Sequence, residues 1–432
     1  MQNSIWCDTV KLPSNNKLKE DITTDVLIIG GGLCGILCQH FLKNAGVNCV
    51  LVEANRIASG ITKNTTAKIT SQHGLIYSSL IKKIGIYDAQ LYLMAHQSAI
   101  DEYEKLCKNT DCDFTRQNSY VYSIDNIKKI ECEINALNKM GFNASFKKEI
   151  ELPFKIDGAV CFKNQAQFNP LKFIFEISKS LKIYENTFVK KLAPGKAITQ
   201  NATIKADSII VATHFPFINK HGNYFLKLYQ ERSYVSAFKN AQTLNGMYLD
   251  ESKSGFSFRS YNDTLLIGCG NHRTGKDSSG WQPIDKFVKS FYPKATLHCQ
   301  WATQDCMSLD NIAYIGQYSK NIKNLYVATG FNKWGMTSSM LSAMILSDMI
   351  LGVENKFKNI FSPQRSILKS QLAINSFESV CNLIIPSKKR CPHLGCSLKW
   401  NKNEHTWDCP CHGSRFESNG KLIDNPSKKD LK

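Results

Sequence analysis

The sequence has few features of secreted or membrane proteins. Its 432 residues contain no uninterrupted apolar run of the ~20 residues that a membrane-spanning helix needs. The most apolar helix-like run, residues 334–352, carries four Ser, one Thr and one Asp, which favours a buried helix. Residues 1–20 are polar and lack the apolar core of a signal peptide. These absences predict a cytoplasmic protein without a membrane span.

Internal repeats and low-complexity tracts are also absent from the sequence. The length allows two or three domains, and a hydrophobic content of 43% is sufficient for large cores. The 16 cysteines are many, but most are scattered and nothing else suggests secretion. We therefore expect most of them to be free, buried thiols in a reducing compartment.

Negative charge is scarce, because 54 Lys and Arg face only 36 Asp and Glu, a net charge of +18. Such an excess raises the question of a nucleic-acid or anionic-membrane partner. The Lys residues are dispersed and the chain is also rich in Asn and Ile, so a nucleic-acid partner is not expected. The last 52 residues carry a net charge of +5. This excess indicates either an ordinary solvated surface or a face that attracts an acidic redox partner.

Two short C-terminal segments combine Cys and His at metal-ligand spacing. The first contains Cys391-Pro-His393, and the second, after 15 intervening residues, contains Cys409-Pro-Cys411-His412. Two thiolates and two imidazoles are the ligands of a [2Fe–2S] centre in which Cys bind one iron and His the other. Tetrahedral zinc is the alternative. A zinc knuckle rarely carries an additional Cys in each loop, as Cys396 and Cys411 are here, so we favour iron–sulfur.

The segments CPHLGC and CPCHGS resemble the Rieske family. This resemblance implies that Cys391 and Cys409 bind one iron and that His393 and His412 bind the other. It also implies a disulfide between Cys396 and Cys411. Only residues 353–390 separate this region from the preceding domain, which leaves little room for a full base of strands. We expect a shortened cluster domain that leans on the rest of the protein.

A glycine-rich motif near the N-terminus predicts a dinucleotide site. An apolar run, residues 25–30, is followed by Gly30, Gly32 and Gly35 in GxGxxG spacing, a helical pattern, and a second strand that ends at Glu53. The glycines let the backbone approach a pyrophosphate at a helix N-terminus, and the acid accepts from a ribose hydroxyl. The whole strand–helix–strand arrangement makes the motif specific.

FAD fits this site better than NAD. No second GxGxxG motif is present for a nicotinamide domain, and the Ser/Thr/Lys-rich segment after Glu53 suits phosphate and flavin contacts. A later buried strand ends at Gly330 and precedes a helix whose positive N-terminus can face the flavin. The remaining predicted cofactor contacts are Ala54, Ser59, Gly60, Gly335, Met336 and Thr337.

The segments LIIGGGLCG, LVEANRIASG and ATGFNKWGMT resemble FAD-dependent oxidoreductases of the D-amino-acid/glycine oxidase family over roughly residues 20–352. This resemblance implies an α/β fold, in which an FAD-binding Rossmann-like domain is interleaved with a mixed β-sheet substrate domain. It also implies oxidation of a C–N bond in an amine or amino acid. We expect the flavin domain at 1–352, a linker at 353–380 and a small all-β Rieske domain at 381–432.

The catalytic residues are poorly determined, because hydride transfer to a flavin needs no strong base. A substrate carboxylate favours a bidentate Arg, so Arg259 is the best candidate, with Arg232 and His272 weaker. A structural role is at least as good an interpretation for each. We expect an amine or amino-acid dehydrogenase that passes electrons through the Rieske cluster to a ferredoxin- or flavodoxin-like acceptor. The alternatives are a tRNA-modifying flavoenzyme and a non-catalytic electron-transfer or redox-sensing module.

Overall fold

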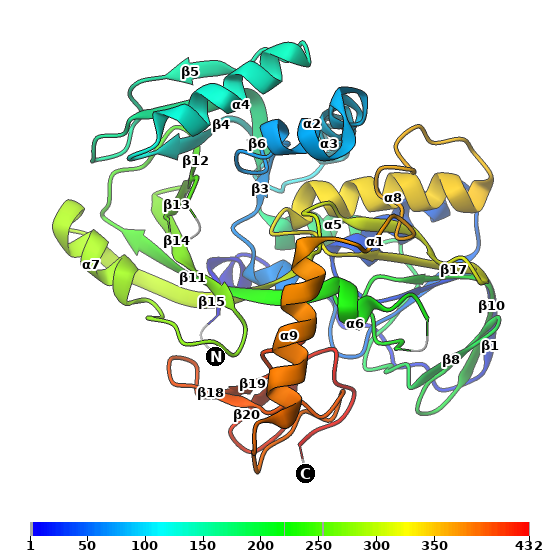
Figure 1. The fold of residues 1–432 in the computed structure, drawn as a ribbon. Coiled ribbons are helices and arrows are strands. Elements are labelled where there is room, and N and C mark those ends of the chain that lie inside the picture. The colour runs from blue at the N-terminus through cyan, green and yellow to red at the C-terminus, as the bar shows by residue number, and fades with distance from the viewer. Residues whose placement is uncertain (1–2, 220, 253–254, 432) are drawn as a thin grey trace.

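The computed structural model describes residues 3–219, 221–252 and 255–431, which form two large sheets and one small sheet (Figure 1). The first large sheet has the order β16-β17-β10-β1-β2-β7, with β9 beside β10 and β8 beside β9. Strand β1 is parallel to β2 and β10, as expected when helices connect consecutive strands. Its strands are β1 (Ile22–Ile29), β2 (Cys49–Val52), β7 (Ile183–Tyr184), β8 (Lys191–Ala193), β9 (Lys196–Ile198), β10 (Thr203–Val211), β16 (Tyr314–Ser319) and β17 (Ile322–Thr329).

The second large sheet has the order β15-β11-β14-β13-β12-β4-β6-β3, with β5 beside β6, and is mostly antiparallel. Its strands are β3 (Lys68–Ile69), β4 (Thr115–Ser123), β5 (Ser145–Lys147), β6 (Gly158–Gln167), β11 (Leu228–Lys239), β12 (Met247–Asp250), β13 (Ser257–Tyr261), β14 (Thr264–Arg273) and β15 (Thr296–Ser308). The two sheets alternate along the chain, which confirms the predicted α/β fold with an interleaved mixed sheet.

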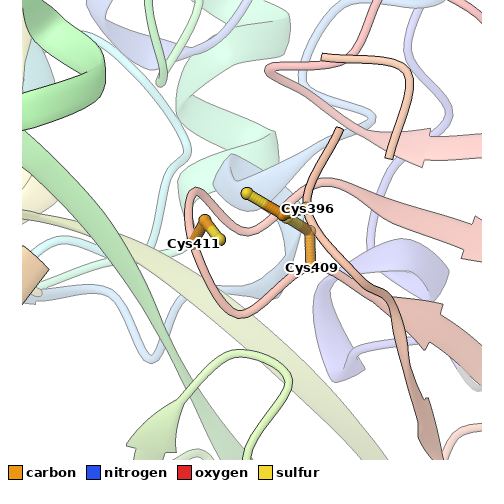
Figure 2. A group of neighbouring side chains, drawn as sticks. All are labelled: Cys396, Cys409 and Cys411. Carbon is orange, nitrogen blue, oxygen red and sulfur yellow. The ribbon is translucent and has the colours of Figure 1, made fainter. Parts of the chain in front are cut away.

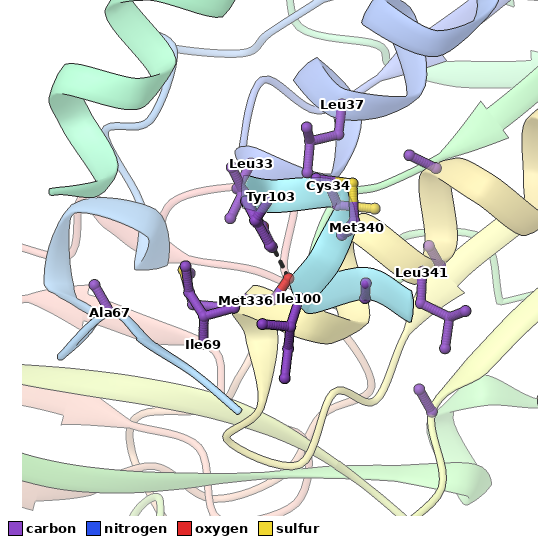
Figure 3. Close-up of a cluster of buried hydrophobic side chains, with 14 of the residues drawn as sticks. Leu33, Cys34, Leu37, Ala67, Ile69, Ile100, Tyr103, Met336, Met340 and Leu341 are labelled. Carbon is purple, nitrogen blue, oxygen red and sulfur yellow. Dashed lines mark hydrogen bonds between the residues drawn. The ribbon is translucent and has the colours of Figure 1, made fainter. Parts of the chain in front are cut away.

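Helices cover these sheets and form the largest core. They are α1 (Leu33–Asn44), α2 (Tyr77–Ile84), α3 (Ile86–Cys107), α4 (Ile127–Lys139), α5 (Pro170–Ser178), α6 (Tyr224–Lys227), α7 (Gln282–Phe291) and α8 (Gly335–Leu351), with short 3-10 turns η1 (Ile5–Asp8) and η2 (Ile61–Asn64). Figure 3 shows α1, α3 and α8 packed together, with Tyr103 donating a hydrogen bond to Met336 O at 2.9 Å. This bond anchors the first turn of α8.

The C-terminal region consists of α9 (Ser370–Ile384) and a four-stranded sheet, β18 (Lys399–Asn401), β19 (Thr406–Asp408), β20 (Arg415–Glu417) and β21 (Leu422–Asp424). The sheet lies below the two large sheets in Figure 1, and α9 runs down to it from the level of α6. Its strands have three residues each, which matches the small all-β domain expected from the sequence. Among the helices of the described residues, none combines the length and the hydropathy that crossing a membrane requires.

Candidate active site and metal centre

A cavity of about 1090 Å³ opens between the two large sheets, and the glycine motif forms one end of it. A Cβ atom on Gly30, whose φ is +115°, would lie 2.5 Å from Ala212 O, and one on Gly35 would lie 2.0 Å from Gly30 O. These two glycines therefore let β1, α1 and β10 pack closely. A Cβ on Gly32 would meet only Thr62 Oγ1, at 3.4 Å, and Gly32 borders the cavity. Its backbone is thus free to face a pyrophosphate at the start of α1.

Glu53 is positioned at the end of β2 by backbone donors. Its carboxylate accepts hydrogen bonds from Gly31 N at 2.6 Å and from Asn55 N at 2.8 Å. Burial raises the pKa of Glu53 against the lowering effect of these donors. The side chain lines the cavity beside the glycine motif, which fits the ribose contact expected of it.

Most of the predicted cofactor residues surround this cavity. Those that line it are Gly30, Gly32, Glu53, Ala54, Ser59, Gly60, Gly335 and Met336. The other three predicted residues do not line the cavity; they are Gly35, Gly330 and Thr337. Thr337 lies behind the lining, where its hydroxyl donates to Thr70 O at 3.2 Å. The first residues of α8 border the cavity, so the positive end of the helix points into the space that would hold the flavin. The donor set and the open backbone at Gly32 fit FAD.

The three catalytic candidates have structural roles here and are not among the residues that line the cavity. Arg259 is buried and donates to Thr66 O at 2.7 Å and Ala67 O at 3.0 Å. Arg232 pairs with Glu404 of the C-terminal region, its Nε donating to Oε1 at 2.7 Å. His272 stacks on Tyr234, with ring centroids 5.7 Å apart.

Several ionisable residues that the sequence motifs did not indicate also line the cavity, among them Lys68 and Asp305. The Lys68 ammonium donates to Tyr248 O at 2.8 Å and Ser257 Oγ at 2.5 Å. Burial, and then the charge of Arg259, lower the pKa of Lys68 to about 7. Burial raises the pKa of Asp305 to about 6. In the sequence, Lys68 could have been found only as a charged residue next to Ile69, in what the structure shows to be the two-residue strand β3.

The Cys and His residues of the C-terminal region come together in two matching loops, residues 391–396 and 409–414, called the cluster loops below. In each loop a Gly four residues after the first Cys donates its N–H to that Cys carbonyl at 2.9 Å. Gly395 and Gly413 both have φ of +83°. Cys391 and Cys409 are buried and their thiols are in contact. The two loops thus present one pair of thiols and one pair of imidazoles.

The imidazoles have the protonation geometry that metal ligation needs. His393 Nε2 donates to Asn219 Oδ1 at 2.9 Å, and His412 Nε2 donates to Phe225 O at 3.0 Å. The Nδ1 atoms of both rings are buried and have no hydrogen-bond partner in the described residues. Because Nε2 carries the proton, each Nδ1 keeps a free lone pair. The rings lie 4.9 Å apart, and this arrangement fits a [2Fe–2S] cluster held by two Cys and two His.

The predicted Cys396–Cys411 disulfide is wrong for this structure. Both residues are free thiols. The sulfur atoms of Cys396, Cys409 and Cys411 form a group in which all lie within 4.8 Å of one another (Figure 2), whereas a disulfide needs ~2.05 Å between two sulfurs. The Cys411 thiol instead approaches Glu378 O of α9, at 3.9 Å.

Comparison with known proteins decides the family. Residues 25–349 match the model of the FAD dependent oxidoreductases, and residues 365–432 match that of the Rieske [2Fe-2S] domain. A Bacillus subtilis (strain 168) protein named as a Rieske 2Fe-2S iron-sulfur protein, YhfW, is 34% identical over 99% of this chain and 96% of its own. The chain belongs to the FAD dependent oxidoreductase family and carries a C-terminal Rieske domain.

Other relatives each resemble one part of this Rieske flavoprotein. The cytochrome b6-f iron-sulfur subunit of Synechococcus sp. (strain JA-3-3Ab) is 49% identical over 41 residues, 10% of this chain and 24% of the subunit. Glycine oxidase from Geobacillus kaustophilus superposes with a TM-score of 0.69 at 17% identity, over 80% of this chain and 99% of its own. L-proline dehydrogenase from P. horikoshii superposes with a TM-score of 0.68 at 16% identity, over 81% of this chain and 98% of its own. These structures share the flavoenzyme fold.

Polar contacts fix the Rieske domain on the FAD domain. Gln230 donates to His412 O at 2.7 Å, and Gln304 donates to Gly413 O at 2.9 Å. The buried Arg232–Glu404 ion pair adds a charged contact, and Glu404 is shared with Arg415 at 2.8 Å. Residues 422–425 and 427–429 also border the flavin cavity. The expected leaning of a small cluster domain on the flavin domain is therefore observed.

Proposed function

We propose that the protein is an FAD-dependent dehydrogenase of an amine or amino acid whose electrons leave through the Rieske cluster. When bound, FAD supplies two-electron oxidation of the substrate, and the cluster carries electrons one at a time to an acceptor. The substrate amine would lose two electrons and two protons, a hydride from carbon and a proton from nitrogen, to become an imine, which water converts to a carbonyl compound and an amine or ammonia.

One segment of the chain carries this proposal, the loop of residues 212–215 that follows β10. Ala212, Thr213 and His214 line the flavin cavity. Phe215, the next residue, is fully buried and packs against both ligand imidazoles, with ring centroids 6.4 Å from His393 and 6.1 Å from His412. Four consecutive residues therefore connect the flavin site to both histidines of the cluster. This contact supports direct electron transfer between the two cofactors within one chain.

The Rieske domain holds this loop in place. Asn425 donates its side-chain amide to Thr213 O at 2.6 Å and to Phe215 O at 2.9 Å. The bonds from His393 and His412 to Asn219 and Phe225 also direct the imidazole edges toward the FAD domain. A histidine edge that faces the FAD domain in this way suits electron transfer to or from the flavin rather than an external partner.

The partly buried ammonium of Lys68 in the cavity indicates the substrate class. Within the described part of the chain, the hydrogen-bond partners of Lys68 are two neutral oxygens, which leaves one ammonium proton free. A partly buried cation without a counter-ion is costly, and a substrate carboxylate would relieve that cost. Lys68 therefore favours an amino acid over a simple amine.

Anaerobic mixing with a panel of amino acids and matching decarboxylated amines tests the proposal. We expect at least one amino acid to bleach the flavin absorbance and then produce the electron paramagnetic resonance signal of a reduced Rieske cluster. In air, the protein should form little hydrogen peroxide. Bleaching by no member of a broad panel, with FAD and cluster fully loaded, would contradict the proposal.

A further inference from the structure

Helix α9 exposes an unusual apolar surface. Ile374, Phe377, Val380 and Ile384 are 51%, 70%, 54% and 74% exposed, and their spacing of three and four residues places them on one face. We call these four residues the α9 stripe. Figure 1 shows α9 at the surface, running from α6 to the small sheet. Large apolar side chains grouped on a surface commonly mark an interaction site.

The stripe continues to the first cluster loop. Leu383 is 46% exposed and Leu394, within the loop, is 40% exposed. The Arg390 guanidinium donates to Leu383 O at 3.1 Å and to Gly395 O at 2.9 Å, which ties the end of α9 to the loop. Leu394 directly follows the ligand His393, so a partner on the stripe would stand beside the cluster.

Positive charge surrounds the apolar surface. Residues 366–402 contain six basic side chains and one acidic side chain, Glu378. Glu378 is already paired with Lys276 at 2.7 Å. Lys388 and Lys389 are exposed between the stripe and the cluster loop. The surface is therefore complementary to an apolar patch with an acidic rim.

We propose that the α9 stripe, with Leu383, Leu394, Lys388 and Lys389, docks a small acidic one-electron carrier protein. The proposal rests on the proposed function, because it gives the route by which electrons enter or leave the cluster. The histidine edges face the FAD domain, so the outer side of the first cluster loop is the side open to a partner. Each substrate oxidation releases two electrons, and two carrier molecules would each take one.

A lipid surface or a second copy of the chain fits the same features less well. Neither would make use of the position of Leu394 beside a cluster ligand. A symmetric pair of stripes would also bring Lys388 and Lys389 of both copies near one another, and like charges at an interface are unfavourable. Both occupants remain outcomes of the test.

The test uses an acidic [2Fe–2S] ferredoxin as probe, because its potential is below that of a Rieske cluster and it can reduce the oxidised cluster whatever the physiological direction. The double variants are Phe377→Ser with Ile384→Ser, and Lys388→Glu with Lys389→Glu. Matched controls are Lys82→Glu with Lys83→Glu, and Tyr87→Ser, which are exposed and lie on α2 and α3, at the opposite end of the molecule from the small sheet in Figure 1. Cluster reduction is followed by stopped-flow absorbance at low and high salt.

We expect the charge reversal to slow cluster reduction about tenfold at low salt and much less at high salt, as steered association requires. The apolar variant should slow it at both, and the controls should match the wild type. A basic c-type cytochrome, accepting electrons from the pre-reduced cluster, should instead react faster with the charge-reversed variant. Unchanged rates in both variants would overturn the proposal.

Two further readouts separate the other occupants. Light scattering that shows a wild-type dimer and a Phe377→Ser/Ile384→Ser monomer would assign the stripe to self-association and overturn the proposal. So would binding to vesicles of phosphatidylglycerol and phosphatidylcholine that the same variant abolishes. No substrate is needed in these measurements, so failure of the proposed dehydrogenase activity leaves their result interpretable.

Discussion

Two residues beside the cluster ligands, Ser414 and Phe416, should tune its potential. The Ser414 hydroxyl is in hydrogen-bonding contact with the Cys391 thiol, while Phe416 is buried in β20 and has no hydroxyl. Donors to the cluster sulfurs stabilise the reduced, more negative form. We predict that Ser414→Ala lowers the midpoint potential by about 60 mV, the one-electron equivalent of ~1.4 kcal/mol. Phe416→Tyr should raise it, and redox titration showing no change in either would refute this account.

Lys68 should make carboxylate binding depend on pH. The pKa of Lys68 is lowered to about 7 in the empty cavity, first by burial. The protonated form binds an anion, so affinity should be full below pH 7 and fall by up to about tenfold per pH unit above it. Benzoate binding, measured through the flavin spectrum, checks this. Lys68→Met should weaken binding and remove the pH dependence, and Lys68→Arg should move its loss to higher pH. A Lys68→Met profile like that of the wild type would exclude the role.

At the scale of elements, the turn between β1 and α1 should determine flavin content. Gly32 faces open cavity, and a Val side chain there would occupy the space of the pyrophosphate. We predict that Gly32→Val folds, keeps its cluster and loses nearly all FAD, measured by absorbance after purification. Gly46→Ala is the control, since Gly46 does not line the cavity and a Cβ there meets no atom within 4 Å, so only the strain of its φ of +82° is added. Full flavin content in folded Gly32→Val would contradict the assignment.

The second cluster loop should depend on Gly413 for docking. A Cβ at Gly413 would lie 2.6 Å from Gln230 Cβ, whereas one at Gly395, which has the same φ of +83°, meets only Leu383 at 3.7 Å. Ala at either position costs about 1 kcal/mol of backbone strain. Gly413→Ala should in addition loosen the domain contact, which limited proteolysis of the Rieske domain will report. Equal protease resistance of the two variants would show that this contact does not hold the domain.

Local patterns in the sequence were sufficient to predict the β1-α1-β2 unit and the pairing of Cys and His in the cluster loops. Gly30, Gly32, Gly35 and Glu53 lie within one short segment, so their spacing alone defines their geometry. Arg232 could not be assigned in this way, because its partner Glu404 is 172 residues distant in the chain. Lys68 was missed for the same reason, since its burial depends on β12 and β13.

At the scale of the whole molecule, potentials restrict the direction of electron flow. Rieske centres span about −150 to +300 mV, whereas plant-type ferredoxins lie near about −400 mV. Export to such a ferredoxin would be uphill, so the predicted ferredoxin-like acceptor fits only as an electron donor. An acidic carrier of higher potential could accept electrons from the cluster. The basic docking surface on α9 is complementary in charge to this carrier and to a ferredoxin alike.

We expect flavin and cluster to exchange electrons inside one chain, across the loop that ends in Phe215. The most direct test is to reduce the flavin by a light flash under anaerobic conditions and to follow the cluster absorbance. The account predicts first-order cluster reduction at a rate independent of protein concentration, slowed in Phe215→Ala while the cluster signal and potential are retained. Cluster reduction that scales with protein concentration, or that does not occur while the flavin is reduced, would contradict it.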